Sequence, residues 1–250
     1  MGVLSGQQLR SFVQGGWVVV SGLVDHADLE AADREVDRLI AEAPPPEDHL
    51  GHHFYWRRTA ESPALFDLLH RPGGILAAAG ELVGSDGVEI AFDQAQVALN
   101  IPPYTHRPGR PHIDGYQPGQ DRPGTFTLLA GVMLTDQLLD NGGNLWVWPG
   151  THLAHAAYFA ERGPEAFSTA GGYPDIALPE PTQVHGRRGD VLLAHYLLGH
   201  NIGGNYQNDR TRRMLYWRLS APGHARRWAD CLVDAWHEYR AIRDLTPQGR

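Results

Sequence analysis

The residues best suited to chemistry are His112 and Asp114, which stand two positions apart, and the distant His200. Two imidazoles and one carboxylate, once brought together, are the ligand set of a mononuclear non-haem iron(II) centre. Three protein ligands on one side of a metal leave the opposite side open, whereas a structural site closes its coordination sphere. These residue types therefore indicate an oxidative metal centre that binds dioxygen.

The spacing of the first two residues is informative only in context. In an extended strand, residues i and i+2 point to the same face, so His112 and Asp114 would aim at one point. Short patterns of this kind recur freely in sequences. A surface loop is the alternative, because Pro111 precedes the pair and Gly115 follows it.

The distal half of the chain strengthens the metal interpretation. Residues 189–200 form a turn, a strand and a second apolar run that ends in His200, and Arg210 and Arg212 stand at the start of the next strand. A dicarboxylate co-substrate that chelates iron at one end needs its far carboxylate held. A guanidinium holds a carboxylate with two parallel hydrogen bonds.

Hydrophobic patterning predicts the elements that must position these residues. Strands are predicted at 17–20, 88–100, 126–135, 143–148, 190–195 and 212–220. Helices are predicted at 5–14, from position 25 or 28 to 42, at 63–69, 74–83 and 225–243. The stretch 49–58 is predicted as a loop, and 151–183 as a long connection with a helix near 161–167.

Helices at both ends with strands between them predict a mainly β fold with flanking helices. We expect a double-stranded β-helix (a cupin-like jelly roll) buttressed by the N- and C-terminal helices. The 250 residues would form a single domain, with an N-terminal region at 1–84, a jelly-roll core at 85–220 and a C-terminal helix at 221–250.

Three ordered motifs carry a resemblance to a known family. They are His112-Ile113-Asp114, the segment from Asn141-Gly142-Gly143 to Pro149-Gly150-Thr151-His152, and residues 189–200 with Asn205 and the following arginines. Across residues 94–220 the chain resembles the phytanoyl-CoA dioxygenase family of iron(II)- and 2-oxoglutarate-dependent oxygenases. The order and the separations of the three motifs agree with those of the family.

The resemblance implies roles by position. It makes His112, Asp114 and His200 the iron ligands, and it makes His195 a core or pocket residue. The family's co-substrate arginine falls at Thr211, so one inserted residue in the turn 206–211 brings Arg212 into place. Because Arg212 and Arg213 face oppositely on a strand, we favour Arg212 and then Arg210.

Two residues depart from what some relatives carry around the co-substrate. Ile113 replaces a glutamine, and Val132 stands where a tryptophan is found. Gln96 is either a replacement contact or an ordinary strand residue, and Asn205 braces the loop after His200 or contributes to the co-substrate site. Because Asp114 fills the position that a halogenase leaves free for halide, hydroxylation or a related oxidation is expected.

The expected substrate is a small organic molecule, in specialised metabolism rather than as a coenzyme A thioester. A lid at 52–58 and aromatic or cationic residues at the pocket mouth are expected to bind it, unless they only pack loops onto the sheet; they are Tyr55, Trp56, Arg57, Tyr104, Tyr116 and Trp146. Two other functions stay open. One is a non-catalytic, cupin-like module that binds a metal or small ligand. The other is a metal dioxygenase that does not use 2-oxoglutarate.

Composition narrows the partners. The formal net charge is −8 and basic residues do not cluster, so nucleic acid is not expected. Apolar stretches are far shorter than the ~20 residues of a membrane helix, so no membrane contact is expected. The single cysteine, Cys231, favours the cytoplasm. The amphipathic C-terminal helix either covers a sheet or pairs two copies in a homodimer.

Overall fold

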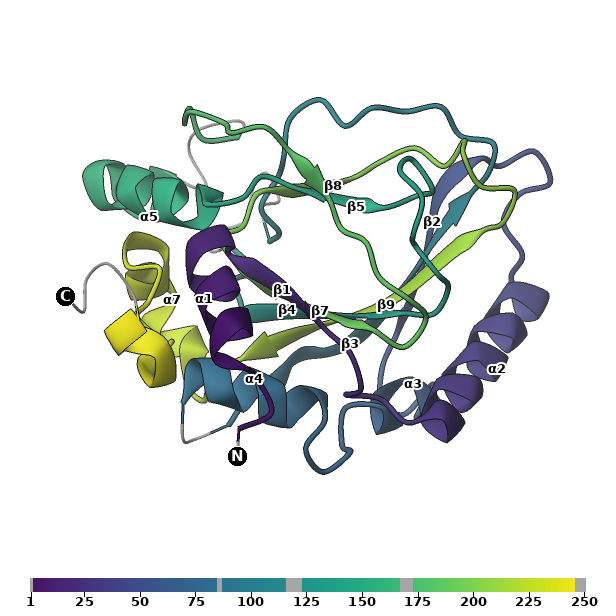
Figure 1. The fold of residues 1–250 in the computed structure, drawn as a ribbon, viewed down its shortest axis with the longest axis horizontal. Coiled ribbons are helices and arrows are strands. Elements are labelled where there is room, and N and C mark those ends of the chain that lie inside the picture. The colour runs from purple at the N-terminus through teal and green to yellow at the C-terminus, as the bar shows by residue number, and fades with distance from the viewer. Residues whose placement is uncertain (1, 85–86, 116–122, 167–172, 246–250) are drawn as a thin grey trace.

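A computed structural model describes residues 2–84, 87–115, 123–166 and 173–245. Its larger sheet has six antiparallel strands in the order β1-β7-β4-β9-β3-β2. Their bounds are β1 Trp17–Val20, β2 Gly51–Arg57, β3 Glu89–Ile101, β4 Leu128–Met133, β7 Val191–His195 and β9 Arg212–Ser220. The three strands from the second half of the chain, β4, β7 and β9, therefore lie side by side in the middle of the sheet, with β1 on one side and β3 and β2 on the other (Figure 1).

The smaller sheet faces the larger one and contains the distal histidine, His200. It has the order β6-β5-β8, with β5 Leu145–Val147, β6 Thr182–Gln183 and β8 His200–Ile202. Isolated bridges join His112 to His200 and Tyr104 to Asn205, so the segment before β4 runs beside this sheet. Two facing antiparallel sheets with flanking helices confirm the predicted cupin-like jelly roll.

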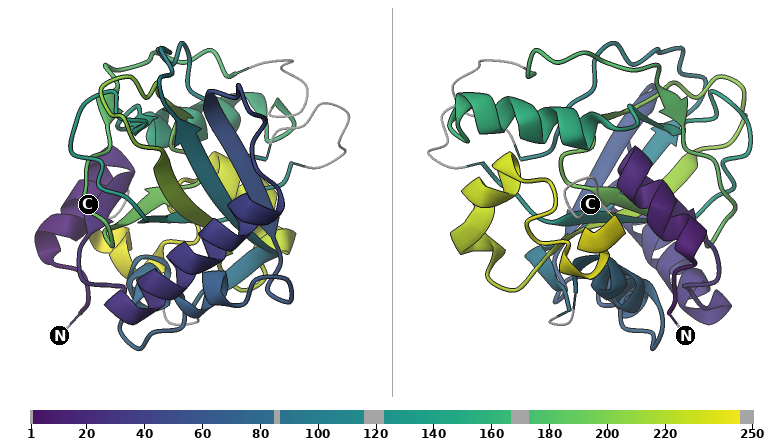
Figure 2. Two further views of the ribbon diagram at one scale, coloured as in Figure 1. Left: turned by 90° about the vertical axis from the view of Figure 1, so that its right-hand side faces the viewer. Right: turned by 60° about the vertical axis from the view of Figure 1, so that its left-hand side comes forward.

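Helices buttress the face of the larger sheet that points away from the smaller one. In Figure 1, α3 and α4 lie below the larger sheet and the smaller sheet lies above it, and Figure 2 shows the same layering from two other sides. The helices are α1 Gly6–Gly15, α2 His26–Glu42, α3 Ala64–Asp67, α4 Ile75–Val83, α5 Thr151–Arg162 and α7 His224–Val233, with a 3₁₀ helix at Arg240–Leu245. No helix in the described ranges is long and apolar enough to cross a membrane.

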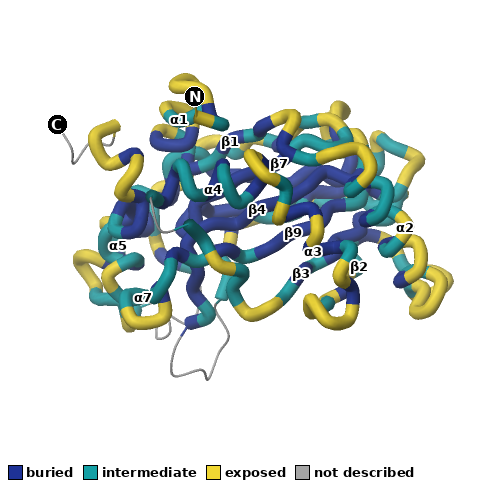
Figure 3. The backbone as a smooth tube through the Cα atoms, turned by 90° about the horizontal axis from the view of Figure 1, so that it is seen from below, coloured by how far each residue is buried: buried dark blue, intermediate teal, exposed yellow. Residues whose placement is uncertain are grey.

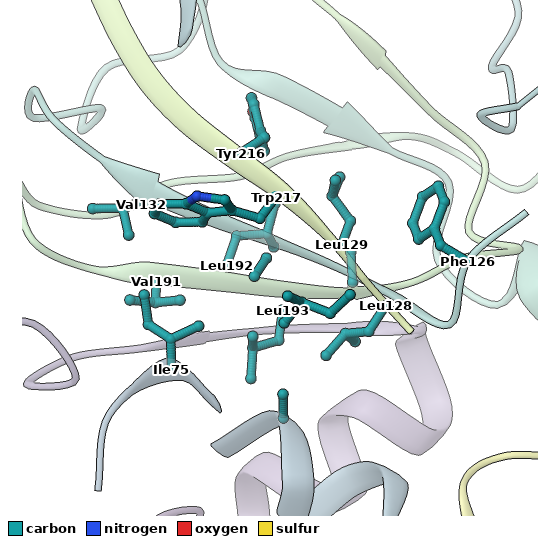
Figure 4. Packing of buried hydrophobic residues seen from close by; sticks show 14 of the residues in the cluster. Ile75, Phe126, Leu128, Leu129, Val132, Val191, Leu192, Leu193, Tyr216 and Trp217 are labelled. Carbon is teal, nitrogen blue, oxygen red and sulfur yellow. The ribbon is translucent and has the colours of Figure 1, made fainter. Parts of the chain in front are cut away.

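The apolar core lies between the larger sheet and these helices. Side chains of β4 alternate, so Leu128 and Val132 face the helices while Leu129 faces the smaller sheet. Figure 4 shows this split, with Leu129 and Tyr216 on one side and Ile75 on the other. Burial is concentrated in the central strands, and exposure in the outer surfaces of helices and in loops (Figure 3).

Three predicted elements were wrong in kind or position. The stretch 49–58 is mostly strand β2, not a loop, because its histidines and aromatic residues suit a strand but occupy both faces and hide the alternation. The connection after β5 begins directly with α5, whose buried face contains Thr151, His152 and His155 and so lacks an apolar period. The C-terminal helix ends at Val233 and a 3₁₀ helix follows, rather than one helix over 225–243.

Candidate active site

Three side chains converge where the sheets open. The carboxylate oxygen Oδ1 of Asp114 lies 3.4 Å from Nε2 of His112 and 3.6 Å from Nε2 of His200. The two imidazole ring centres are 4.5 Å apart. The side chain of His112 is half exposed, whereas those of Asp114 and His200 are largely buried. One side of the group is therefore open and the other is enclosed by protein.

Backbone pairing brings the two histidines together. The amide of His112 donates to the carbonyl of His200 at 2.9 Å, and the amide of His200 donates back at 3.0 Å. Gly115 fixes the turn after Asp114: its φ is +83°, and a Cβ there would lie 2.3 Å from the carbonyl oxygen of Gly124. Only glycine fits that conformation and that contact.

Hydrogen bonding orients the distal imidazole. Nδ1 of His200 lies 2.9 Å from the carbonyl oxygen of Leu198 and can only donate to it. The lone pair of Nε2 is thereby directed toward Asp114, which is how buried histidine ligands are usually held for a metal. The separations of 3.4 and 3.6 Å from Oδ1 of Asp114 approach the roughly 3 Å between neighbouring ligands that each lie about 2.1 Å from a metal, and all three donor atoms lie within 4.8 Å of one another. The donor set therefore fits iron(II).

Asp114 is ionised in this setting. Burial alone would raise the pKa of its carboxyl group, but the neighbouring imidazoles of His112 and His200 and the guanidinium of Arg218 outweigh burial and hold that pKa well below its usual range. Arg218 reaches Oδ2 of Asp114 with Nη2 at 2.7 Å and with Nε at 3.1 Å. A charged carboxylate is the form that a metal requires.

Arg212 is a buried cation without an anion. It is 1% exposed, Nε donates to Oε1 of Gln137 at 3.1 Å, and Nη2 donates to the hydroxyl of Tyr216 at 2.9 Å. Its Nη1 has no partner, and no carboxylate in the described part of the chain pairs with it. A buried guanidinium normally has a carboxylate or phosphate partner. This unsatisfied donor fits the far carboxylate of 2-oxoglutarate.

A cavity of about 320 Å³ is lined by His112, Asp114 and His200, and also by Tyr216, whose hydroxyl accepts a hydrogen bond from Arg212. Its volume suits a small molecule. Apart from these three candidate metal-binding residues, the wall is made by β2, β3, β4, β5, β8 and β9, through His52, Phe54, Trp56, Gln96, Leu129, Leu145, Asn201, Ile202, Tyr216 and Arg218. A larger hollow of about 840 Å³ beside α2 does not contain the triad, and Arg210 lines that one.

The predicted substrate residues are divided by strand alternation. Trp56 lines the cavity, whereas Tyr55 is buried on the other face of β2 and donates to the carbonyl of Ala43. Arg57 shares the face of Tyr55. Trp146 alternates with the cavity residue Leu145 and does not line the cavity.

The remaining predicted residues lie at various distances from the cavity. Tyr104 stacks on His106, outside the cavity wall. Asn205 donates both amide protons to main-chain carbonyls, including that of Arg210, so it holds the turn before β9. Tyr116 lies outside the described residues.

His195 and Val132 are structural neighbours of the site rather than parts of it. Nε2 of His195 lies 2.7 Å from the carbonyl of Ala235, and Nδ1 accepts from the amide of Leu197 at 2.9 Å, which leaves neither nitrogen free for a metal. Val132 faces the helices, away from the cavity, so its replacement of a tryptophan does not alter the wall. Ile113 is also buried in the core.

Sequence reasoning included His52 and Phe54 only as part of the lid at 52–58, and it missed the cavity residues Tyr216 and Arg218. Alternation could have found them. Stepping by two from Arg212 along β9 reaches Tyr216 and Arg218, and the same step backward from Trp56 reaches Phe54 and His52. The pairing of Gln96 with Tyr216 across the sheet could not have been read from one sequence.

A jelly roll with a His-x-Asp and a distal histidine at its open end defines the class of non-haem iron(II)- and 2-oxoglutarate-dependent oxygenases. The sequence model of phytanoyl-CoA dioxygenases (PhyH) matches residues 12–214, and the chain belongs to this family. The family's cofactor is iron(II) and its co-substrate is 2-oxoglutarate. Among curated protein sequences, none matches the chain.

Solved structures share the fold. HygX from Streptomyces hygroscopicus, with nickel and 2-oxoglutarate bound, is 19% identical over 88% of both chains, with a TM-score of 0.61. SnoK, a carbocyclase of nogalamycin biosynthesis, is 20% identical over 91% of this chain and 92% of its own, with a TM-score of 0.61. EctD from S. alaskensis, with iron bound, is 18% identical over 88% of this chain and 78% of its own, also with a TM-score of 0.61.

Proposed function

We propose that this oxygenase hydroxylates a small organic molecule, with His112, Asp114 and His200 as the iron ligands and Arg212 as the anchor of 2-oxoglutarate. The observation that carries the proposal is the convergence of three metal donors in one cavity, next to a buried arginine that has an unsatisfied donor. When bound, iron(II) with 2-oxoglutarate and dioxygen supplies the oxidant, and the co-substrate leaves as succinate and carbon dioxide.

The chain's own residues would bind, orient and exclude water. Arg212 and Tyr216 would fix the far carboxylate of the co-substrate, so its keto acid end faces the triad. Leu129, Leu145 and Ile202 would keep that end dry and direct one C–H bond of the substrate toward the metal. Asp114 occupies the position of the carboxylate ligand, which favours hydroxylation over halogenation.

The cavity also indicates the kind of substrate. Its wall is largely apolar and aromatic, and the charge of its arginine, Arg218, is neutralised by Asp114. Phe54 and Trp56 are 38% and 40% exposed, so they present flat apolar faces at the mouth. These features favour an uncharged molecule with an apolar or ring-shaped face over an acyl coenzyme A or an amino acid.

Absorbance spectroscopy tests the metal and co-substrate assignment. Anaerobic addition of iron(II) and 2-oxoglutarate should give a metal-to-ligand charge-transfer band that Asp114→Ala abolishes. Asp140→Ala is the matched control, because Asp140 forms an exposed pair with His185 at 2.9 Å and should leave the band intact. Absence of the band in folded wild-type protein would refute the proposal.

Two further measurements separate the alternative functions. Slow succinate formation without added substrate distinguishes an enzyme from a non-catalytic binding module. Oxygen consumption that does not depend on 2-oxoglutarate, and that survives loss of both Arg210 and Arg212, would indicate the other type of dioxygenase.

We also propose that the chain forms one domain, that it is located in the cytoplasm and that it forms a homodimer. The support for these three proposals comes from the sequence. A single cysteine, Cys231, suits a reducing compartment, which cell fractionation would test. Light scattering of the purified chain would decide between a monomer and a dimer, and limited proteolysis would reveal any second folding unit.

A further inference from the structure

The two oxygens of Asp114 face different partners. Oδ1 faces the imidazoles of His112 and His200, at 3.4 and 3.6 Å. Oδ2 accepts from Arg218 twice, from Nη2 at 2.7 Å and from Nε at 3.1 Å. Each carboxylate oxygen has about two lone-pair positions. The two donors of Arg218 therefore saturate Oδ2 and leave Oδ1 as the atom that is free to bind a metal.

We propose that Arg218 is a positioning residue that restricts Asp114 to metal binding through one oxygen. The proposal rests on the function proposed above, because it assumes that Asp114 is a metal ligand. A carboxylate can bind a metal through one oxygen or through both. Asp114 could chelate only if Arg218 released Oδ2, which would leave a largely buried guanidinium, 14% exposed, without its anion.

Neighbouring side chains hold Arg218 in place. Nη1 and Nη2 lie 3.3 and 3.4 Å from Oε1 of Gln96, at the edge of hydrogen-bonding range. The guanidinium carbon is 5.1 Å from the ring centre of Trp56 and 5.8 Å from that of Phe126. Aromatic faces attract a guanidinium at such distances.

Restricting Asp114 to one oxygen controls how many coordination positions stay open. A six-coordinate metal with three protein donors keeps about three positions for other ligands, whereas a chelating carboxylate would leave only about two. A co-substrate that chelates takes two positions. Only the restricted arrangement then keeps one more position for dioxygen.

Manganese(II) as a probe can count the open positions directly. Water-proton relaxation measures the number of waters bound to Mn²⁺ in the protein, without turnover. We expect about three waters in the wild type and about two in Arg218→Met, a drop in inner-sphere relaxivity of about one third. Two waters in the wild type, or three in a folded Arg218→Met variant, would overturn the proposal.

Control variants separate the possible failures. Arg213→Met removes another arginine of β9, whose Nη1 pairs with Asp37 at 2.7 Å far from the site, and should keep three waters. If Arg218→Met does not fold, Arg218→Gln retains a polar side chain but cannot fill both positions on Oδ2, and the same drop is expected. If wild-type protein fails to bind Mn²⁺, or Asp114→Ala binds it equally well, the metal site itself is wrong.

Discussion

Replacing Arg212 with methionine should change co-substrate binding and protein stability in opposite directions. The guanidinium is buried at the start of β9, donates to Gln137 and Tyr216, and leaves Nη1 without a partner. In the bound state it would gain the carboxylate of 2-oxoglutarate. Without co-substrate, the protein carries the cost of the buried charge and gains nothing from an ion pair.

The magnitudes follow from that difference. Removing one partner of a buried, hydrogen-bonded charge pair costs about 2–5 kcal/mol of binding free energy, which raises Kd by about 30-fold or more. Replacing a buried ion pair by apolar side chains of similar size is neutral or stabilises a protein by about 1–4 kcal/mol, and we expect the same range for a buried arginine that lacks its anion. Methionine approximates the length of the arginine stem, so little packing is lost.

Two assays on the same protein preparations test the expected effects of Arg212→Met on co-substrate affinity and on stability. Calorimetric titration of the nickel-loaded protein gives Kd for 2-oxoglutarate, and urea unfolding without metal or co-substrate gives the free energy of unfolding. Arg213→Met is the control, since Arg213 lies on the opposite face of β9 and pairs with Asp37. An Arg212→Met variant whose Kd rises less than about threefold, or whose unfolding free energy falls by more than about 2 kcal/mol, would refute the reasoning.

Three further changes should have distinct outcomes. Burial lowers the pKa of His195 to about 4 from 6.5, so at acid pH the unfolded chain binds a proton that the folded chain does not. This residue alone should lower the free energy of unfolding by about 2 kcal/mol between pH 7.5 and pH 5. In urea titrations His195→Gln should remove that part of the pH dependence. Gly131→Ala places a methyl group 2.6 Å from the ring of Tyr216, which should displace the Tyr216 hydroxyl from the guanidinium of Arg212. The Kd for 2-oxoglutarate, measured by calorimetry, should then rise about tenfold; an unchanged Kd would contradict this. Gly115→Ala should weaken Mn²⁺ binding, because its methyl group would collide with the backbone beside Asp114. Gly22→Ala is the control: this glycine also has a positive φ, but open space surrounds it, so the variant should lose only about 1–2 kcal/mol of stability.

The candidate metal-binding residues of the site could be predicted from the sequence more completely than the residues that line its cavity. The i, i+2 spacing of His112 and Asp114 and the strand start at Arg212 are local features. The structure brings the first two together with His200, and it links Arg212 to the cavity residue Tyr216. The contact between Arg218 and Asp114 joins residues 104 positions apart. It depends on how the segment before β4 crosses β9, which no local pattern encodes.

Two of the three errors in the fold, at β2 and α5, have a common physical origin. β2 and α5 bury histidine, threonine or aromatic residues that also form hydrogen bonds, so the apolar period that marks an amphipathic element is absent. Nδ1 of His155 in α5, for example, lies 2.6 Å from the carbonyl of Leu197. Where polar side chains are buried because the backbone pairs with them, hydrophobic patterning alone misplaces the element.

The reciprocal backbone hydrogen bonds between His112 and His200 have a consequence for metal choice in the cell. They hold the two histidines side by side through the backbone itself, so we expect the polypeptide to complete its fold before any ion arrives. A site of this kind cannot reject an ion by refusing to fold around it. Divalent ions bind nitrogen and oxygen donors in an order that puts copper, nickel and cobalt ahead of iron(II). Which ion the newly made protein acquires would therefore be set by the free concentrations that the cell maintains, and mismetallation would yield a folded but inactive oxygenase.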